Sequence, residues 1–501
     1  MRKFYVISLI LSIFIISSCN KEEELRISEI LETKYVDVNK TFNDNVTFGG
    51  TLKKFINNIE DHGFVYGTSP SPQYEIDSTI SLGIPEIEGN FSEIVHGFNP
   101  GTMYYTRAFV KTDKKILYGE DIDFHITIID KISKKYAGKG GTIVIHGTNF
   151  GEKKSDNIVK INNIAVDIVS ISHSDWGSDI TIKIPTENIN LGIKDVSIEI
   201  NGIQTILNEA FEVIPYTEMP NLPGLKRVNA VGFSINGLFY IGTGYDSNNQ
   251  YRKDFYCYNP ESRTWSEIAD LPGVGRSGAV AFTIHNFAYV GLGTNGSGSL
   301  TDFYKYNPST NSWTQISNFS GDERADASAF TLTNQGYVGL GCKAKSQFRL
   351  GEFFNDFFIY NPNDDSWSEL DTVAISARTD AASIVYEDKV YIGKSTHNST
   401  ILKEDFWEFE PIEKKWTKIK SPGGDELSIQ FPKGFTIKDK GYIVGSLYYY
   451  EFDFISQIWN QFYYLHLELS SNFFRGIGIS NGEFAIIGLG GENNCFYEFR
   501  P

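Results

Sequence analysis

The sequence predicts an all-β protein of several domains, of which the last is built from repeats. Tyr, Phe and Gly are abundant, with 28, 37 and 46 copies in 501 residues, as expected for short strands joined by tight turns. An aromatic residue also precedes a Trp by seven positions again and again in the C-terminal half. With 41% hydrophobic residues the chain can bury a core, and its 21% charged residues are too few for a coiled coil.

Charge and cysteine content exclude several function classes. The net charge of −17 argues against a nucleic-acid partner, because a phosphate backbone repels an acidic protein. Beyond Cys19, the cysteines are Cys257, Cys342 and Cys495, and three thiols cannot pair completely. The CxxC spacing of many metal sites is absent from the sequence. We therefore expect no disulfide framework, no metal site and no cofactor.

The first residues have the pattern of a targeting signal. Arg2 and Lys3 precede an apolar run of 13 residues, 4–16. A helix of that length spans about 20 Å, short of a bilayer core of about 30 Å, so a signal peptide is predicted over residues 1–18. The small residues ending in Cys19 resemble a lipobox, which implies diacylation of Cys19 and a lipid anchor in the membrane. The alternative is a cleaved secretory signal with an incidental Cys.

The segment after Cys19 indicates the membrane to which the protein is exported. Residues 20–24 read Asn-Lys-Glu-Glu-Glu, and Asn20 is not the Asp that favours retention in the inner membrane. A Lys followed by acidic residues resembles the surface-export tag of Bacteroidota lipoproteins. This resemblance implies an outer-membrane protein that faces the cell exterior, with residues 19–27 as lipidated cysteine and tether. The alternative is a solvated linker.

Two β-sandwiches are predicted before the repeats. In residues 28–127, the run Gly-Phe-Asn-Pro-Gly-Thr-Met-Tyr-Tyr-Thr that starts at Gly97 resembles a fibronectin type III domain. In that family a Tyr closes a corner onto nearby backbone, a role open to Tyr104 or Tyr105.

Residues 128–214 resemble an IPT/TIG domain, on the run Gly-Gly-Thr-Ile-Val-Ile-His-Gly-Thr-Asn-Phe-Gly that starts at Gly140. We expect Phe150 to plug one end of that sandwich. Both domains are expected to be spacers, with Trp176 as an alternative ligand platform.

The strongest signal is the repeat beyond residue 215. The aromatic and Trp pairs are Tyr258/Trp265, Tyr306/Trp313, Tyr360/Trp367, Phe409/Trp416 and Phe452/Trp459, and the Trp spacings are 48, 54, 49 and 43. In the first three pairs Asn-Pro follows the aromatic residue and starts a turn. Each unit is thus a strand, a short turn and a strand that carries Trp. This pattern resembles kelch repeats, whose units of about 50 residues fold as four-stranded propeller blades.

Six blades are predicted over residues 215–501. The chain ends before the outer strand of the last blade, and residues 216–224 match residues 265–273 position by position. An N-terminal strand that completes the last blade would close the ring. The predicted fold is therefore all-β: two immunoglobulin-like β-sandwiches followed by a six-bladed kelch β-propeller.

A basic residue precedes each inner strand, and the blade symmetry would arrange these residues as a ring around the central channel. They are Arg227, Arg276, Arg324, Arg378, Lys433 and Arg475. Six cations repel one another unless acids or an anionic ligand compensate them. Asp322 and Glu323 are candidate partners of Arg324, and Asp380 is one of Arg378. The ring is either a binding face or a set of forked hydrogen bonds that hold the blades together.

Aromatic side chains are expected near this ring. The loops before the first strand and between the second and third strands lie on one face of a propeller. Phe348 and Arg349 fall in the longest of these loops, and Tyr448 and Tyr449 fall on the same rim. Exposed aromatics beside Arg form a recognition surface for a glycan or a protein. The alternative for residues 448–450 is an ordinary strand end.

Catalysis is poorly supported. The repeat region has three histidines, His285, His397 and His466, and HExxH, GxSxG and P-loop motifs are absent from the sequence. We therefore predict no catalytic residue, and we expect noncovalent binding of a glycan or a protein at the propeller face. The kelch resemblance leaves an alternative, because some six-bladed members are sialic-acid epimerases. That alternative is a sugar epimerase or mutarotase that acts outside the cytoplasm.

Overall fold

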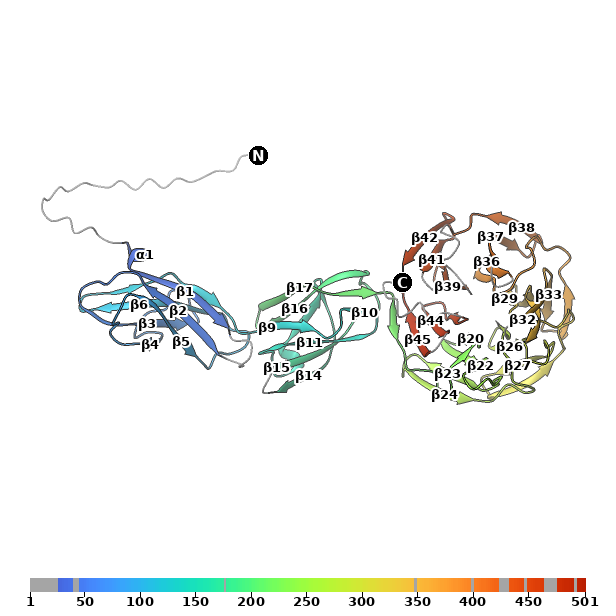
Figure 1. The fold of residues 1–501 in the computed structure, drawn as a ribbon, viewed down its shortest axis with the longest axis horizontal. Coiled ribbons are helices and arrows are strands. Elements are labelled where there is room, and N and C mark those ends of the chain that lie inside the picture. The colour runs from blue at the N-terminus through green and yellow to red at the C-terminus, as the bar shows by residue number, and fades with distance from the viewer. Residues whose placement is uncertain are drawn as a thin grey trace, which may run out of the picture. The chain divides into compact units, whose positions relative to one another are not determined.

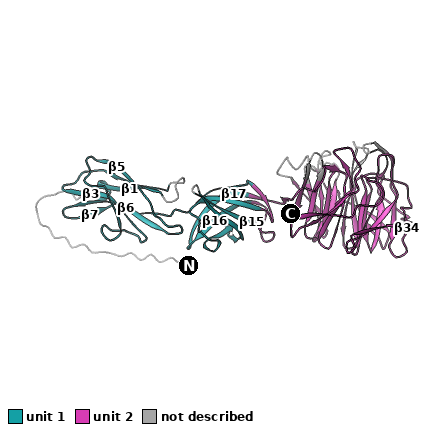
Figure 2. Ribbon diagram, turned by 90° about the horizontal axis from the view of Figure 1, so that it is seen from below, with its two compact units in different colours: residues 1–135, 142–183, 193–211 teal, residues 136–141, 184–192, 212–501 magenta. Residues whose placement is uncertain are grey.

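The computed structural model describes residues 26–38, 45–174, 177–346, 349–397, 401–422, 432–445, 448–463, 475–490 and 493–501. The chain forms two compact units (Figure 2). The first comprises residues 1–135, 142–183 and 193–211, and the second comprises residues 136–141, 184–192 and 212–501. Among the described residues, no helix has the length and hydrophobicity needed to span a membrane.

The first sandwich follows a short helix and has two antiparallel sheets. One sheet has the order β1-β2-β5, and the other has the order β4-β3-β6-β7, with β8 also paired to β6. The elements are α1 (Ile27–Ile30), β1 (Leu31–Val38), β2 (Val46–Leu52), β3 (Ile59–Gly67), β4 (Ser78–Ser81), β5 (Gly89–Val95), β6 (Tyr104–Thr112), β7 (Ile116–Tyr118) and β8 (Ile122–Phe124). Phe48 and Phe64 pack between the sheets with ring centroids 5.7 Å apart. At the start of β6, the buried Tyr104 hydroxyl accepts a hydrogen bond from the Asn99 N–H at 3.0 Å, so Tyr104 closes the expected corner.

The second sandwich pairs a four-stranded sheet, β14-β15-β11-β9, with a five-stranded one, β10-β17-β16-β12-β13. Its elements are β9 (Ile128–Ile132), β10 (Tyr136–Gly138), β11 (Thr142–Thr148), η1 (Lys154–Asp156), β12 (Ile158–Ile161), β13 (Ile164–Ala165), β14 (Ile168–Ser174), β15 (Gly177–Lys183), β16 (Gly192–Ile200) and β17 (Ile203–Ile214). Phe150 is buried over Gly147, where a Cβ would come within 2.4 Å of the Phe150 ring. Gly147 therefore makes room for the predicted plug.

The rest of the second unit is a six-bladed propeller, and Figure 1 shows the blades following one another around a central axis. This arrangement confirms the predicted fold class. Blade 1 is β20 (Val231–Ile235), β21 (Leu238–Gly242), β23 (Phe255–Asn259) and β24 (Thr264–Ile268). Blade 2 is β25 (Val280–Ile284), β26 (Phe287–Gly291), β27 (Phe303–Asn307) and β28 (Ser312–Ile316). Blade 3 is β29 (Ser328–Leu332), β30 (Gln335–Gly339), β33 (Phe357–Asn361) and β34 (Ser366–Glu369).

The later blades continue this pattern. Blade 4 is β35 (Ala382–Tyr386), β36 (Lys389–His397), β37 (Ile401–Glu410) and β38 (Lys415–Ile419). Blade 5 is β39 (Lys433–Ile437), β40 (Lys440–Val444), β41 (Tyr448–Asp453) and β42 (Ile458–Tyr463). Blade 6 is β43 (Ile477–Ser480), β44 (Ala485–Gly490), β45 (Asn493–Phe499) and β18 (Tyr216–Glu218). Outside these sheets lie the pairs β19 (Arg227–Val228) with β22 (Tyr245–Asp246) and β31 (Cys342–Ser346) with β32 (Arg349–Phe353).

The ring closes as the sequence predicts. β18 pairs antiparallel with β45, and Tyr216 lies opposite Phe499. The Tyr216 side chain is buried in a cluster that includes Phe435 and Tyr442 of blade 5. The last blade therefore joins the two ends of the repeat region, and β18 covers the edge of β45 that would otherwise be open.

The repeating Trp joins neighbouring blades. In each case Trp Nε1–H donates to a backbone carbonyl just beyond the outer strand of the preceding blade. These bonds run from Trp265 to Pro220 (2.8 Å), Trp313 to Ala269 (2.8 Å), Trp367 to Ser317 (3.1 Å), Trp416 to Thr372 (2.8 Å) and Trp459 to Lys420 (2.9 Å). The partially buried indole needs a partner for its N–H, and the preceding blade supplies it. The Trp repeat is thus a repeat of contacts between blades.

Candidate functional site

Four of the six predicted basic residues form buried ion pairs, which we call the Arg–Asp latches. They join Arg227 to Asp254, Arg276 to Asp302, Arg324 to Asp356 and Arg378 to Asp405. In the first, Arg227 Nη1 and Nη2 donate to Asp254 Oδ1 and Oδ2 at 2.7 and 2.8 Å. Each Arg precedes the inner strand of its blade. Each Asp directly precedes a Phe of the third strand, at the end of the segment that pairs with the second strand. Every latch therefore ties the first strand of a blade to its third.

Backbone carbonyls complete each latch. Arg276 Nη1 also donates to Leu292 O at 3.2 Å, and its Nε donates to Val274 O at 3.3 Å. In the other direction, the carbonyl of Arg276 accepts a hydrogen bond from Gly244 N–H of the preceding blade at 2.8 Å. Gly244 has φ +98°, a conformation that favours glycine. The latches thus hold neighbouring blades as well as neighbouring strands.

The charges in the latches stabilise one another strongly. Burial alone would raise the pKa of Asp302, but the hydrogen bonds and charge of Arg276 outweigh it and hold the pKa below its ordinary value. The same balance of burial against the arginine lowers the pKa of Asp254, paired with Arg227, and of Asp405, paired with Arg378. These carboxylates are therefore ionised at neutral pH.

The latches change the expectation for the basic ring. The side chains of the four arginines, Arg227, Arg276, Arg324 and Arg378, are fully buried, so the surface for a ligand is not made of them. The expected neighbours are not their partners either. Asp322 contributes only its carbonyl to Arg324, Glu323 pairs with Lys343 at 2.9 Å, and Asp380 pairs with Lys433 at 3.2 Å. The geometry supports the structural interpretation of these four residues.

Lys433 and Arg475 do not occupy the latch position. Each latch Arg lies four residues before its inner strand, whereas Lys433 is the first residue of β39 and Arg475 lies two residues before β43. The expectation of one sixfold ring is therefore corrected to four latches and two displaced cations. The irregular spacings of 55 and 42 reflect this displacement.

A second ring lies just inside the latches, and we call it the channel mouth. Its residues have left-handed φ values: Asn229 (50°), Gly278 (67°), Asp326 (52°), Asp380 (51°) and Arg475 (57°). Each of the first four donates its N–H to the carbonyl of the equivalent residue in the preceding blade. These bonds run Asn229 to Arg475 (3.0 Å), Gly278 to Asn229 (3.1 Å), Asp326 to Gly278 (3.0 Å) and Asp380 to Asp326 (3.0 Å). A continuous series of backbone hydrogen bonds therefore fixes the mouth.

Charged side chains gather at this mouth in what we call the charged cluster: Asp326, Asp380, Lys433 and Arg475. Lys433 Nζ lies 3.2 Å from Asp380 Oδ1. Burial and the nearby Asp380 carboxylate raise the pKa of Asp326 to about 7, against the opposing influence of Arg475 and Lys433. The cluster therefore combines two carboxyl groups and two cations, and Asp326 holds its proton more tightly than an ordinary aspartic acid.

The cluster borders a hollow axis. A cavity of about 180 Å³ at this end of the channel is lined by Asp380 and Lys433, together with small residues of the inner strands such as Ala230, Gly232 and Ala327. A second cavity of about 310 Å³ farther along the channel is lined by inner-strand residues that include Ser234, Thr283, Thr436 and Ser480. The channel is open because inner strands alternate large side chains, buried between blades, with small ones on the axis.

The predicted aromatic rim takes a different form. Tyr449 is buried in β41, where it stacks on Phe462 with ring centroids 4.8 Å apart and contacts Phe499 edge-on at 5.0 Å. Tyr449 is therefore a core residue and not part of a recognition surface, which corrects that expectation, because its strand turns it inward. Tyr448 is the first residue of β41, and Arg349 is the first residue of β32. Phe348 and Trp176 lie outside the described residues, as do Cys19 and His466.

Sequence reasoning missed the acidic partners. Asp254, Asp302, Asp356 and Asp405 each stand four residues before the repeating aromatic residue and directly before a Phe. This Asp-Phe pair is a repeat signal that could have revealed the latches. Among the described residues, no group of three His, Cys, Asp or Glu side chains is arranged to hold a metal ion.

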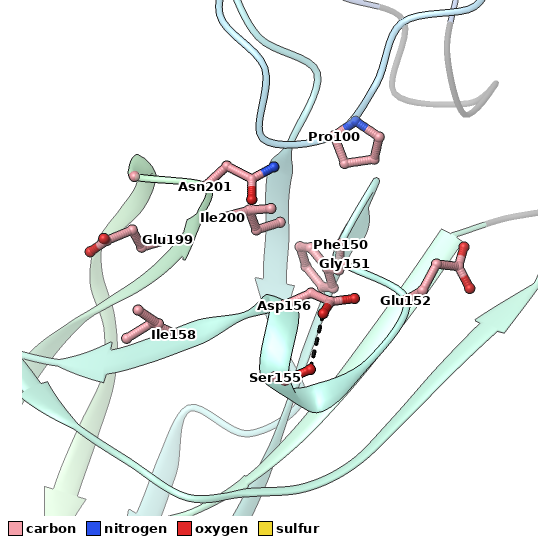
Figure 3. Close-up of a pocket in the computed structure, with 11 residues that line it drawn as sticks. Pro100, Phe150, Gly151, Glu152, Ser155, Asp156, Ile158, Glu199, Ile200 and Asn201 are labelled. Atoms are coloured by element: carbon pink, nitrogen blue, oxygen red, sulfur yellow. Dashed lines mark hydrogen bonds between the residues drawn. The ribbon is translucent and has the colours of Figure 1, made fainter.

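The first unit has a hollow of its own, of about 490 Å³, lined mainly by residues of the second sandwich (Figure 3). Phe150, Ile158 and Ile200 give it apolar walls, while Glu152 and Glu199 bring carboxylates. Glu199 is already paired with Lys160 at 2.7 Å. This hollow is open to solvent, and its lining contains acidic residues but no basic ones. It is therefore a weaker candidate for a ligand-binding site than the channel mouth.

Comparisons with known proteins agree with this architecture. Residues 213–377 match the family model described as the KLHDC2/KLHL20/DRC7 Kelch-repeats domain, and residues 127–211 match the IPT/TIG domain. These matches confirm the kelch and IPT/TIG resemblances over the residues that they cover. A search of curated proteins finds no match. A solved structure titled "Structure of YjhT" is similar at 16% identity with a TM-score of 0.46, covering 56% of this chain and 95% of that one.

Proposed function

We propose that this protein is a lipid-anchored outer-membrane protein, facing the cell exterior, whose propeller binds a ligand noncovalently at the channel mouth. The observation that carries the proposal is the charged cluster at the open end of a hollow axis. Two of its members, Asp380 and Lys433, line one small cavity, and a few polar groups of this kind orient ligands in protein sites generally. The two sandwich domains act as spacers.

The binding part of the proposal is tested with the full-length protein in detergent. The double variant Asp380→Asn/Lys433→Gln removes the pair that borders the cavity without leaving either charge alone. We expect it to lose binding to the ligand found on a glycan array or by capture of a protein partner. The matched control is Asp371→Asn, since the Asp371 side chain is 78% exposed. Equal binding by the double variant and the wild type would contradict the proposed site.

The membrane part of the proposal depends on Cys19. The variant Cys19→Ser removes the thiol that the lipobox resemblance requires. We expect the variant to remain unacylated by mass spectrometry and to leave the outer-membrane fraction, while the wild type is cut by protease added to intact cells. Retention of an acylated variant in the membrane would contradict lipidation at Cys19. Protection of the wild type from protease would contradict only the outward orientation.

A second function, sugar epimerisation or mutarotation, is supported by one observation. A carboxyl group whose pKa is about 7 can give and take protons at neutral pH, and Asp326 is such a group beside two cations. If this function holds, NMR shows faster exchange of sialic acid anomers or epimers than buffer does, and Asp326→Asn abolishes the acceleration. A rate equal to that of buffer removes this candidate and leaves the binding proposal standing.

A further inference from the structure

The channel mouth is hollow because of the residues that face it. Two of these positions, Gly232 and Gly434, are glycines at close approaches between blades. A Cβ at Gly434 would lie 2.5 Å from Ser383 O, and one at Gly232 would lie 2.1 Å from the Ile479 side chain. Small side chains such as Ala279 and Ala327 complete the lining, so the cavity walls consist largely of backbone and methyl groups. The polar side chains of this lining are Asp380 and Lys433 of the charged cluster, with Ser328 and Ser383, and the two charged ones distinguish ligands most strongly.

The arrangement of the cluster disfavours a ligand with a single charge. Asp326 and Asp380 come from blades 3 and 4, whereas Lys433 and Arg475 come from blades 5 and 6. When all four are ionised their charges cancel, and when Asp326 is protonated the cluster carries one net positive charge. An anion at the mouth would face two carboxylates, and a cation would face an ammonium and a guanidinium, so either would meet repulsion along with attraction.

Hydroxyl groups suit all four side chains. Carboxylates only accept hydrogen bonds, whereas ammonium and guanidinium groups only donate them, and a hydroxyl group can do both. A ligand with several adjacent hydroxyls can therefore satisfy Asp326 and Asp380 as a donor and Lys433 and Arg475 as an acceptor. Gly278 leaves room for the Asp326 carboxylate, since a Cβ at Gly278 would come within 2.4 Å of Asp326 Oδ1.

The size of the cavity limits what can enter. Its volume of about 180 Å³ is well below the ~300 Å³ at which pockets for drug-sized ligands begin. A single ring fits this space better than a folded peptide or an oligosaccharide segment. The mouth lies at one end of the axis, so a longer chain would present its terminal unit.

We propose that the channel mouth binds one uncharged sugar unit, free or at the end of a glycan. The sugar hydroxyls donate hydrogen bonds to Asp326 and Asp380, and the sugar oxygens accept hydrogen bonds from Lys433 and Arg475. This inference rests on the proposed binding function and names its ligand class. The charged groups that face Asp326 are Asp380, Lys433 and Arg475, and the buried thiol of Cys342 lies close to the same two carboxylates. Cys342 remains a neutral thiol because burial raises its pKa.

The test is saturation-transfer NMR on the full-length protein with small probes that differ in charge. The probes are glucose, galactose and mannose, against glucuronate, glucosamine and glycine. We expect one or more of the neutral hexoses to bind, with little change between low and high salt, because an uncharged ligand is insensitive to screening. In Asp380→Asn/Lys433→Gln the affinity for that hexose falls about tenfold or more, whereas Asp371→Asn retains it.

The outcomes separate this inference from the proposed function. Preference for glucuronate, glucosamine or glycine, weakened by the same double variant, overturns the uncharged sugar and leaves the channel mouth as the site. If the double variant binds the hexose as tightly as the wild type does, the site itself is overturned. Melting temperatures of the two proteins are compared, so that both are known to be folded in the binding experiment. If no probe binds, the inference is overturned, and a protein ligand captured through the mouth would still support the proposed function.

Discussion

Arg276 and Asp302 form a two-point ion pair in which Nη1 and Nη2 lie 2.7 and 2.6 Å from the two carboxylate oxygens, and the arginine side chain is fully buried. The same geometry recurs in three other blades. A charge of this kind is costly to bury without its partner. Four of the six basic residues that the repeat pattern aligns therefore serve the stability of the propeller, and the ligand site that we propose lies on the residues just inside them.

Replacing Arg276 by Ala should destabilise the protein by about 3–5 kcal/mol, because Asp302 would remain partly buried without its counter-charge. Urea unfolding measures this loss. The paired change Arg276→Met/Asp302→Leu should recover much of it, since it removes both charges together. Folded Arg276→Ala protein is expected to bind ligand normally. A folded variant that has lost binding would show that the latch contributes to the site.

Replacing Trp313 by Phe should cost about 0.5–1.5 kcal/mol for the hydrogen bond from Nε1 to Ala269 O, with a further small loss of packing. The Phe ring keeps contact with Tyr306 and Phe255, whose centroids lie 4.8 and 5.1 Å from the indole. Thermal unfolding of the two proteins side by side gives the difference. An unchanged stability would mean that this bond between blades is replaced by water without penalty.

Replacing Tyr216 by Ala should weaken the closure of the ring. The buried ring of Tyr216 pairs with Phe499 and packs on blade 5, so its loss is expected to cost about 3–5 kcal/mol. Hydrogen exchange should report earlier opening of β45 than of β26 in blade 2. The control is Glu218→Ala, an exposed position on the same strand. Equal protection of the two blades in Tyr216→Ala would contradict a closing role for β18.

Asp326 should make the protein less stable as the pH rises. The unfolded chain protonates this carboxyl only below about pH 4, whereas the folded chain does so below about 7. Between these values the folded state binds more protons, so the free energy of unfolding falls with increasing pH. We expect Asp326→Asn to be more stable than the wild type at pH 8 by about 1 kcal/mol or more, and nearly equal at pH 4.

Urea unfolding at several pH values measures this linkage, with Asp371→Asn as the exposed control. At the acid end, the latch carboxylates act in the opposite sense. Because the pKa values of Asp254, Asp302 and Asp405 are lowered, the stability that they contribute is lost as the pH falls below about 4 in both proteins. A variant that is less stable than the wild type at pH 8 would show that ionised Asp326 stabilises the fold.

Contacts that repeat within every blade were visible in the sequence. Trp313 and its equivalents recur because each donates to the same backbone position of the preceding blade. Tyr216 could be aligned with Trp265 because both stand in an outer strand opposite the repeating aromatic residue. Periodic packing leaves a periodic sequence, so the repeat and its resemblance to kelch repeats predicted the propeller, and the match of residues 216–224 to residues 265–273 predicted the N-terminal closing strand.

The sequence by itself determined the all-β class, the repeat and the manner in which the ring closes, because these depend on residues at fixed distances along the chain. Only the tertiary structure decided which charges meet. Arg276 pairs with Asp302 rather than with a neighbour in sequence, Lys433 pairs with Asp380 of the preceding blade, and the charge of Arg475 in blade 6 acts to lower the pKa of Asp326 in blade 3. A few residues of displacement in blades 5 and 6 turn an apparent ring of six cations into four latches and one cluster of mixed charge. The latch arginines and the two displaced cations differ in their distance from the start of the inner strand. Where an inner strand begins depends on its contacts with neighbouring strands and blades, and not on the local sequence.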